Sequence, residues 1–150
     1  MWQRIQTIWL LLAFAAMAVF LFLPIGLFAT PQGTWVMYNI STEPLVEGTN
    51  LSNWGLFALA LIISLLSLAI VFLYKRRKLQ MRLVMLNMLL TIGYFIYYIV
   101  EIIMRTKELN ASYGFKFAIA LPIVTFILLT MARRGIHKDE ILVRMSNRLR

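Results

Sequence analysis

The chain has 150 residues, of which 61% are hydrophobic and 14% are charged, and its formal net charge is +9. A domain of this size cannot bury so much apolar surface, so the composition excludes a water-soluble globule as well as a disordered chain. Cysteine is absent and histidine occurs once, which excludes disulfides, cysteine nucleophiles and all-histidine metal sites.

Four apolar stretches have about the roughly 20 residues that a helix needs to cross a bilayer. They cover about residues 8–28, 54–74, 83–104 and 113–132. Because backbone polar groups in lipid must pair within their own segment, we expect these stretches to be helices. The sequence therefore predicts an all-α membrane protein with a single domain over residues 1–150, built as an antiparallel four-transmembrane-helix bundle.

The first apolar stretch has some features of a secretory signal peptide. A cation, Arg4, precedes it, but the apolar run outlasts the 7–15 residues of a cleavable signal, and no A-x-A-like cleavage site follows it. We interpret it as an uncleaved signal anchor. Pro24 and Gly26, near its far end, are tolerable where the last turn of a helix frays or kinks.

Between the first two apolar stretches lies the outer loop, residues 30–53. Residues 34–40 are rich in β-forming side chains, and Glu43-Pro44 and Glu47-Gly48 are turn signals. A short β-hairpin over the outer ends of the helices is compatible with this pattern.

The third stretch carries polar side chains three and four residues apart, along one face of a helix. These are Asn87, Thr91, Tyr94, Tyr98, Glu101 and Arg105, and we call them the polar stripe. Polar groups that face lipid are costly, so the polar stripe is expected to face the interior of the bundle. Two interpretations remain open: hydrogen bonds between helices, or the lining of a path or a small-molecule pocket.

Glu101 requires a cationic partner, and the sequence offers two. Arg105 follows four residues later, which is the favourable order within a helix. Lys116 lies near the start of the fourth stretch at a comparable depth, and we hypothesise a Glu101–Lys116 contact between the third and fourth helices. Lys116 could instead extend its ammonium group to the interface.

The basic residues are unevenly distributed among the predicted loops. With the N-terminus inside, most of the 15 lysines and arginines fall on the inner side, and Arg105, Lys107 and Lys116 remain outside. The positive-inside rule then predicts that both termini are cytoplasmic.

Within the cytoplasmic tail, residues 133–150, the segment from Gly135 to Arg150 is predicted to form an amphipathic helix. Its apolar stripe is Ile141, Leu142, Met145 and Leu149. Such a helix can lie on anionic lipid or place its apolar face in a groove of a partner protein. The candidate basic surface comprises Arg77, Lys78, Arg82, Arg134, Lys138, Arg144, Arg148 and Arg150. Nucleic acid ranks below lipid and protein as a partner, because no aromatic side chains alternate with the tail arginines.

Sequence motifs for catalysis are absent. His137 lies in the polar tail, and Asp139 and Glu140 are adjacent, so their carboxylates point in different directions on a helix. The chain has no glycine-rich phosphate loop, nucleophile elbow or H-E-x-x-H motif. We expect neither an enzyme nor a bound cofactor or metal.

Three segments resemble a four-transmembrane-helix inner-membrane family of Bacteroidota classified as a domain of unknown function. They are Gln3-Arg4-Ile5-Gln6-Thr7; Arg77-Lys78-Leu79-Gln80 with Arg82 and Asn87; and Lys138-Asp139-Glu140-x-Leu142-Val143-Arg144 through Arg148-Leu149-Arg150. One departure is Asn147, where members of the family often have Asp. The resemblance implies a multi-pass protein of the bacterial inner (cytoplasmic) membrane and no particular activity.

Two functions follow as hypotheses. The first is a non-catalytic membrane protein that acts as an accessory subunit or docking platform through its basic cytoplasmic face. Its partners would be the anionic inner leaflet and a protein, either in a membrane complex or as a second copy of this chain. The alternative is a small transporter or ligand-binding bundle that uses the polar stripe.

Overall fold

A computed structural model describes residues 2–31, 33–44, 51–74 and 76–148 of the chain. Of residues 2–4, 143–144 and 146–148 it describes the backbone alone.

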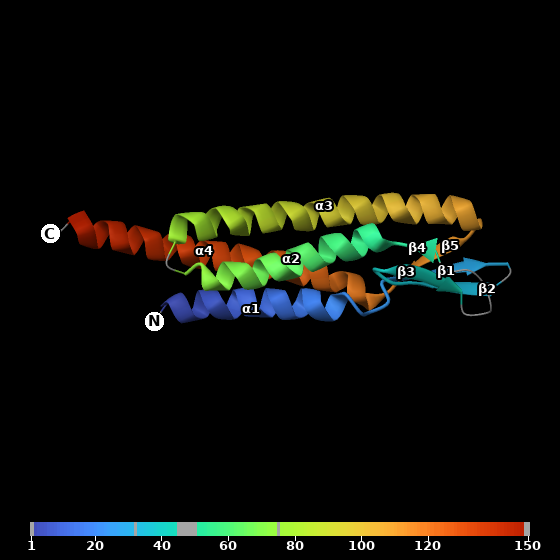
Figure 1. Cartoon of the computed structure of the whole chain (residues 1–150), viewed down its shortest axis with the longest axis horizontal. Helices are drawn as coiled ribbons and strands as arrows, with labels where there is room; N and C mark the ends of the chain where they lie inside the picture. The colour runs from blue at the N-terminus through green and yellow to red at the C-terminus, as the bar shows by residue number, and fades with distance from the viewer. Residues whose placement is uncertain (1, 32, 45–50, 75, 149–150) are drawn as a thin grey trace.

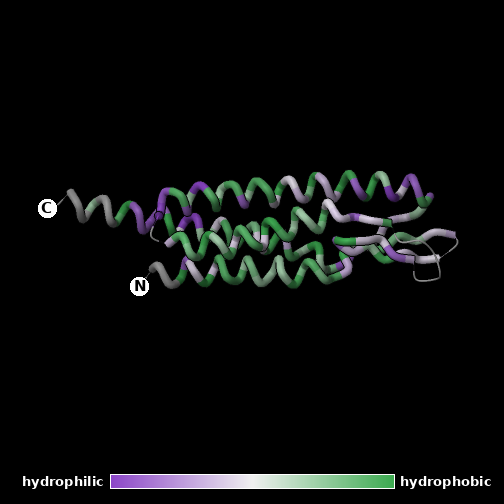
Figure 2. Tube along the Cα trace, viewed as in Figure 1, coloured by the Kyte–Doolittle hydropathy of each residue, from purple (hydrophilic) through white to green (hydrophobic). Residues whose placement is uncertain are grey.

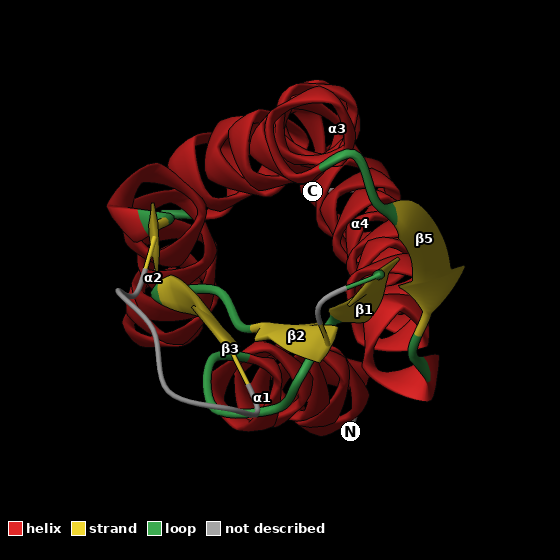
Figure 3. Ribbon diagram, turned by 90° about the vertical axis from the view of Figure 1, so that its right-hand side faces the viewer, coloured by secondary structure: helices red, strands yellow, loops and turns green. Residues whose placement is uncertain are grey.

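Within the described residues, long helices form a ring that follows the order of the chain (Figure 3). The helices are α1 (Trp2–Phe20), α2 (Trp54–Phe72), α3 (Arg77–Leu109) and α4 (Ala120–Arg148), and a 3-10 turn, η1 (Phe117–Ile119), precedes α4. Each helix packs against the next along the chain, and α4 packs against α1, which closes the ring.

The connections from α1 to α2 and from α3 to α4 form an antiparallel sheet at the end of the bundle opposite the two termini (Figure 1). Its strands are β1 (Gly26–Thr30), β2 (Gly33–Met37), β3 (Ser41–Pro44), β4 (Leu51–Ser52) and β5 (Ser112–Phe115). The spatial order is β4-β3-β2-β1-β5, so the chain leaves α3 and adds β5 beside β1.

The prediction of an all-α bundle is therefore wrong, because a five-stranded antiparallel sheet is part of the described fold. The sequence allowed one hairpin in the outer loop, and β2 and β3 do pair there. The sheet also includes β1 and β5, which overlap the ends of stretches predicted to be helical. In their pairing, Gly26 lies opposite Phe115 and Phe28 lies opposite Tyr113.

The end of the first predicted helix explains part of this error. α1 ends at Phe20, well before residue 28. Pro24 has no amide hydrogen and its ring clashes with a preceding helical carbonyl, so it stops the helix here instead of kinking it. The apolar residues beyond Pro24 continue as a strand, because burial on a sheet also satisfies their hydrophobicity.

The predicted ends of α3 and α4 also require correction. α3 has 33 residues and is about 50 Å long, so it exceeds the roughly 30 Å hydrocarbon core and runs beside the sheet. α4 begins at Ala120 and continues to Arg148, so the predicted tail helix is the end of α4 and not a separate element.

Among the described residues, three helical segments are long and apolar enough to cross a membrane: Trp54–Phe72, Arg77–Leu109 and Phe117–Leu142. The described apolar part of α1, Ile5–Phe20, is shorter. In the most apolar windows of the three long segments, 33%, 28% and 22% of the residues are buried inside the protein, so most of their side chains face outward. The hydrophobic middle and the hydrophilic ends of the bundle support a membrane protein (Figure 2).

Candidate functional site

The polar stripe of α3 lies largely inside the helix ring. Asn87, Thr91, Tyr94 and Tyr98 are all buried. Asn87 donates from its amide nitrogen to Oγ of Ser67 on α2 at 2.7 Å and to the carbonyl of Ile63 at 3.3 Å. This part of the stripe therefore joins α3 to α2.

Farther along α3, the stripe contacts the connections at the sheet end. The Tyr94 hydroxyl donates to Oδ1 of Asn39 at 2.6 Å, and the Asn39 amide donates to the carbonyl of Phe20 at 2.8 Å. Asn39 thus satisfies one of the carbonyls at the end of α1, which lack partners within their own helix.

The next tyrosine of the stripe pairs with a tyrosine of the sheet. The hydroxyls of Tyr98 and Tyr113 share a short hydrogen bond, and each hydroxyl also lies 3.3 Å from the carbonyl oxygen of Ile25. Burial raises the pKa of Tyr113 above its ordinary value, and the hydrogen bond with Tyr98 partly offsets this increase. Tyr113 therefore remains a neutral hydrogen-bond donor at physiological pH.

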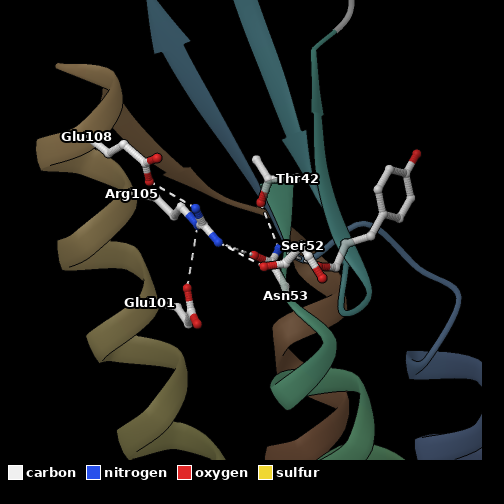
Figure 4. Close-up of polar contacts among 7 residues, drawn as sticks. Thr42, Ser52, Asn53, Glu101, Arg105 and Glu108 are labelled. Atoms are coloured by element: carbon white, nitrogen blue, oxygen red, sulfur yellow. Dashed lines mark hydrogen bonds and ion pairs between the residues drawn. The ribbon is translucent and has the colours of Figure 1, made fainter. Parts of the chain in front are cut away.

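At the end of the stripe, Arg105 joins α3 to the β4–α2 junction (Figure 4). Its guanidinium donates to the carbonyl of Ser52 at 2.8 Å and to Oδ1 of Asn53 at 3.3 Å. It also pairs with Glu101 at 3.5 Å and with Glu108 at 2.9 Å. The planar guanidinium can reach all four groups because its donors fan out in a fixed plane.

Lys116 does not join the polar stripe in the way we hypothesised. It lies between β5 and η1, and no ion pair among the described residues joins it to Glu101. The partner of Glu101 is Arg105, the other possibility that the sequence offered. The strand β5 occupies the stretch in which Lys116 was expected to begin a helix.

The opposite end of the bundle carries the candidate basic surface. Arg77 begins α3 and pairs with Asp139 of α4 at 3.4 Å, so this predicted surface residue also ties two helices together. Lys78, Arg82, Arg134 and Lys138 are exposed.

A groove of about 220 Å³ lies between α1 and α4 at this end. We call it the α1–α4 groove, and its lining residues are Ile5, Gln6, Trp9, Met131, Arg134, Gly135 and Lys138. A second hollow, of about 430 Å³, is lined by Met81, Thr130, Arg133, Arg134 and His137. Arg134 therefore lines both hollows.

The apolar stripe of the tail is partly described. Leu142 and Met145 are exposed at 55% and 60%, and Ile141 is exposed beside them. Arg144 and Arg148 belong to α4, but their side chains lie outside the described residues, as do Leu149 and Arg150 entirely.

The arrangement is suited to holding elements together and to binding anions or apolar groups at its surface. Within residues 2–31, 33–44, 51–74 and 76–148, no cluster of three or more His, Asp or Glu side chains could hold a metal ion.

The sequence did not identify three structurally important residues. Asn39 gave no signal, because its partners Tyr94 and Phe20 are distant in the chain. Tyr113 stands at the start of the fourth apolar stretch, where nothing in the sequence indicates its hydrogen bond with Tyr98. Gln6 is buried, and its amide nitrogen has no hydrogen-bond partner within the described structure. A polar residue at the start of an apolar helix was the one available signal for Gln6.

Comparison with known sequences bears on the identity of the chain. No curated protein matches it. The model of the family described as Domain of unknown function (DUF4293) matches residues 2–149. Because this match covers nearly the whole chain, the protein belongs to the DUF4293 family.

Proposed function

We propose that this protein is a non-catalytic protein of the bacterial inner membrane, of the kind found in Bacteroidota, that docks a partner protein on its cytoplasmic side. Its role is that of an accessory subunit or a docking platform. The docking element is the end of α4, residues 140–148, which we call the α4 extension.

The observation that carries this proposal is the projection of α4 past its neighbours (Figure 1). Arg77, the first residue of α3, pairs with Asp139, so the α4 extension lies beyond the start of α3. It adds about 13 Å of helix at the usual rise per residue. Ile141, Leu142 and Met145 are exposed on it.

An exposed apolar stripe on a projecting helix favours docking. Positions 141 and 142 are adjacent, and position 145 follows them by four and three residues, so the three apolar side chains share one face of the helix. A partner that offers a hydrophobic groove would remove this face from water. Arginines at positions 144 and 148 would favour an acidic rim around that groove.

The orientation is part of the proposal. Both termini lie at the same end of the bundle, where α3 also begins (Figure 1). Arg77 and Arg82 belong to the first turns of α3, and Arg134 and Lys138 line the α1–α4 groove. The positive-inside rule assigns such an end to the cytoplasm and the sheet to the outer side. Anionic lipids of the inner leaflet would attract the same cations.

The polar stripe supports docking more than transport. Asn87, Tyr94 and Tyr98 each have hydrogen-bond partners on another element, as expected for contacts that hold the bundle together. A transport path would instead need polar groups that exchange partners with a substrate. We therefore rank a small transporter or ligand-binding bundle second.

Capture from native membranes in a mild detergent, followed by mass spectrometry, tests the docking proposal. A chain with Leu142→Gln and Met145→Gln should lose a protein that co-purifies with the unaltered chain. The matched control, Leu142→Met with Met145→Leu, keeps both positions apolar and should retain it.

The result is interpretable because both side chains are exposed, so the glutamine variant should insert and fold normally. Its thermal unfolding in detergent should match that of the unaltered chain. If the same partner co-purifies equally with both variants, the α4 extension is not the docking element.

A further inference from the structure

The α1–α4 groove is amphipathic along the direction of the helices. Met131, Arg134 and Lys138 are three and four residues apart, so they share one face of α4. α1 and α4 run in opposite directions (Figure 1). Trp9 and Met131 therefore lie toward the middle of the bundle, whereas Lys138 lies toward the chain termini.

The cations of the groove are available to an external anion. Among the ion pairs of the described residues, none includes Arg134 or Lys138. The nearest acidic neighbour in sequence, Asp139, pairs with Arg77. The groove thus has two positive charges at one end and no carboxylate among its lining residues.

α1 and α4 approach closely at Gly135, which lines the groove together with Gln6. A Cβ atom on Gly135 would lie 2.9 Å from Cγ of Gln6, so the glycine is what permits this approach. The amide nitrogen of Gln6 is buried there without a hydrogen-bond partner in the described structure. An unpaired buried donor is costly, and an oxygen atom of a ligand in the groove would remove that cost.

We propose that the α1–α4 groove binds one anionic phospholipid of the inner leaflet. The phosphate lies between Arg134 and Lys138, and one acyl chain follows the apolar wall past Trp9 and Met131. This ligand matches both halves of the groove: phosphate complements the two cations, and hydrocarbon covers the apolar wall. Tryptophan is also favoured at the depth where headgroup meets acyl chain.

The dimensions favour a lipid chain over other occupants. The volume of about 220 Å³ is below the roughly 300–1,000 Å³ typical of pockets for compact small molecules. A partner helix is about 10 Å across with its side chains, so even one turn of it takes up more space than the groove offers.

Native mass spectrometry of the full-length protein in a mild detergent tests the proposal. Phosphatidylglycerol and phosphatidylcholine with identical acyl chains are titrated separately. One phosphatidylglycerol should bind at least about tenfold more tightly than phosphatidylcholine, since each cation near an anionic lipid contributes a severalfold gain. Equal affinities for the two lipids would overturn the proposal.

Two double variants with the same loss of charge locate the site. Arg134→Gln with Lys138→Gln should abolish the preference for phosphatidylglycerol. Arg76→Gln with Lys107→Gln removes two exposed cations outside the groove and should leave the preference intact. An equal loss in both variants would reduce the preference to an effect of net charge and overturn the proposal.

A third variant tests the apolar half without changing charge. Met131 is 41% exposed, so Met131→Trp adds bulk over the groove without filling the core. It should weaken the binding of both lipids. Unchanged binding would mean that the acyl chain does not lie in the groove. The variants are compared only where their thermal unfolding in detergent matches that of the unaltered chain.

Two further experiments test whether free phosphate or a second copy of the chain occupies the groove instead. Inorganic phosphate at millimolar concentration should not displace the lipid; complete displacement would assign the site to free phosphate. A lipid-free dimer that dissociates in the Arg134 and Lys138 variant would assign the groove to a second copy. Either result would overturn the proposal.

The assignment of the groove to the inner leaflet rests on the orientation given under the proposed function. The binding measurement does not, because it uses purified protein outside any membrane. A failure to capture a partner protein through the α4 extension would leave the lipid measurement standing, and the reverse also holds.

Discussion

The hydroxyl of Tyr94, at the middle of α3, donates a 2.6 Å hydrogen bond to Oδ1 of Asn39, in the connection between β2 and β3. Both side chains are fully buried. The Asn39 amide in turn donates a hydrogen bond to the carbonyl of Phe20 at the end of α1. One asparagine therefore links the sheet end of the molecule to two helices.

Tyr94→Phe should lower the free energy of unfolding by about 1 kcal/mol, because it leaves the Asn39 carbonyl oxygen buried without its donor. Unfolding with increasing denaturing detergent, followed by circular dichroism, measures the change. The effect should depend on Asn39. In a background carrying Asn39→Leu, the same tyrosine substitution should cost much less.

Tyr38→Phe is the matched control for this prediction. Tyr38 is half-buried, and no side-chain hydrogen bond of its hydroxyl is found in the described structure. Its replacement should change stability by no more than about 0.5 kcal/mol. Equal losses for the two tyrosines would mean that the Tyr94–Asn39 bond contributes nothing specific.

Arg105→Met should destabilise the fold by about 2 kcal/mol or more, because it leaves the largely buried carboxylate of Glu101 without its ion pair. It also removes the donors to the carbonyl of Ser52 and to the side chain of Asn53 (Figure 4). Adding Glu101→Gln should recover part of the loss, since the unpaired charge is then absent. Denaturing-detergent titration of the single and double variants provides the measurement.

The same experiment separates the two partners that the sequence offered to Glu101. Lys116→Gln should leave stability nearly unchanged, because no ion pair joins Lys116 to Glu101 in the described residues. Restoration of a Glu101→Lys variant by Lys116→Glu would contradict the arrangement seen at Arg105.

The sequence could predict the long helices but not the sheet. In α2 and α3 the apolar runs are long, lack proline and leave no alternative to a helix in lipid. The pairing of Gly26 with Phe115 joins residues far apart in the chain, and no local pattern encodes it. Short apolar segments such as 26–30 have the same hydrophobicity in a strand as in a helix.

In the candidate sites too, local spacing predicted which residues share a helix face, but not which residues they contact on other elements. The spacing of Asn87, Tyr94 and Tyr98 placed them on one helix face, and all three side chains are buried. Their partners came from other elements and could not be inferred from spacing. The groove beside Gly135 depends on how closely two helices pack, which hydropathy does not report.

Gly26→Ala should disrupt the sheet, because an added Cβ would overlap the hydroxyl and ring of Tyr113 on the neighbouring strand. We expect a loss of about 1–3 kcal/mol, the usual range for overpacking, with a lower melting temperature in detergent. Tyr113→Phe in the same chain should recover only the part of the clash due to the hydroxyl.

Gly93→Ala is the control within α3. Nothing lies within 4 Å of a Cβ added there, and alanine favours a helix by about 0.5–1 kcal/mol over glycine. This variant should be as stable as the unaltered chain or more stable. A melting temperature that falls equally for both glycine variants would rule out the specific overlap with Tyr113.

The proposed orientation in the membrane can be determined by labelling introduced cysteines, because the chain has no cysteine of its own. A cysteine at exposed Ser112, in the sheet, should react in intact spheroplasts with a maleimide that cannot cross membranes. A cysteine at exposed Lys78 should react only after the membrane is permeabilised. A cysteine at Ile96, which is 61% exposed on the apolar middle of α3, should remain unlabelled in both conditions because lipid covers it. Labelling of the Lys78 position in intact spheroplasts would reverse the orientation, since it would put the basic end and the α4 extension outside the cytoplasm.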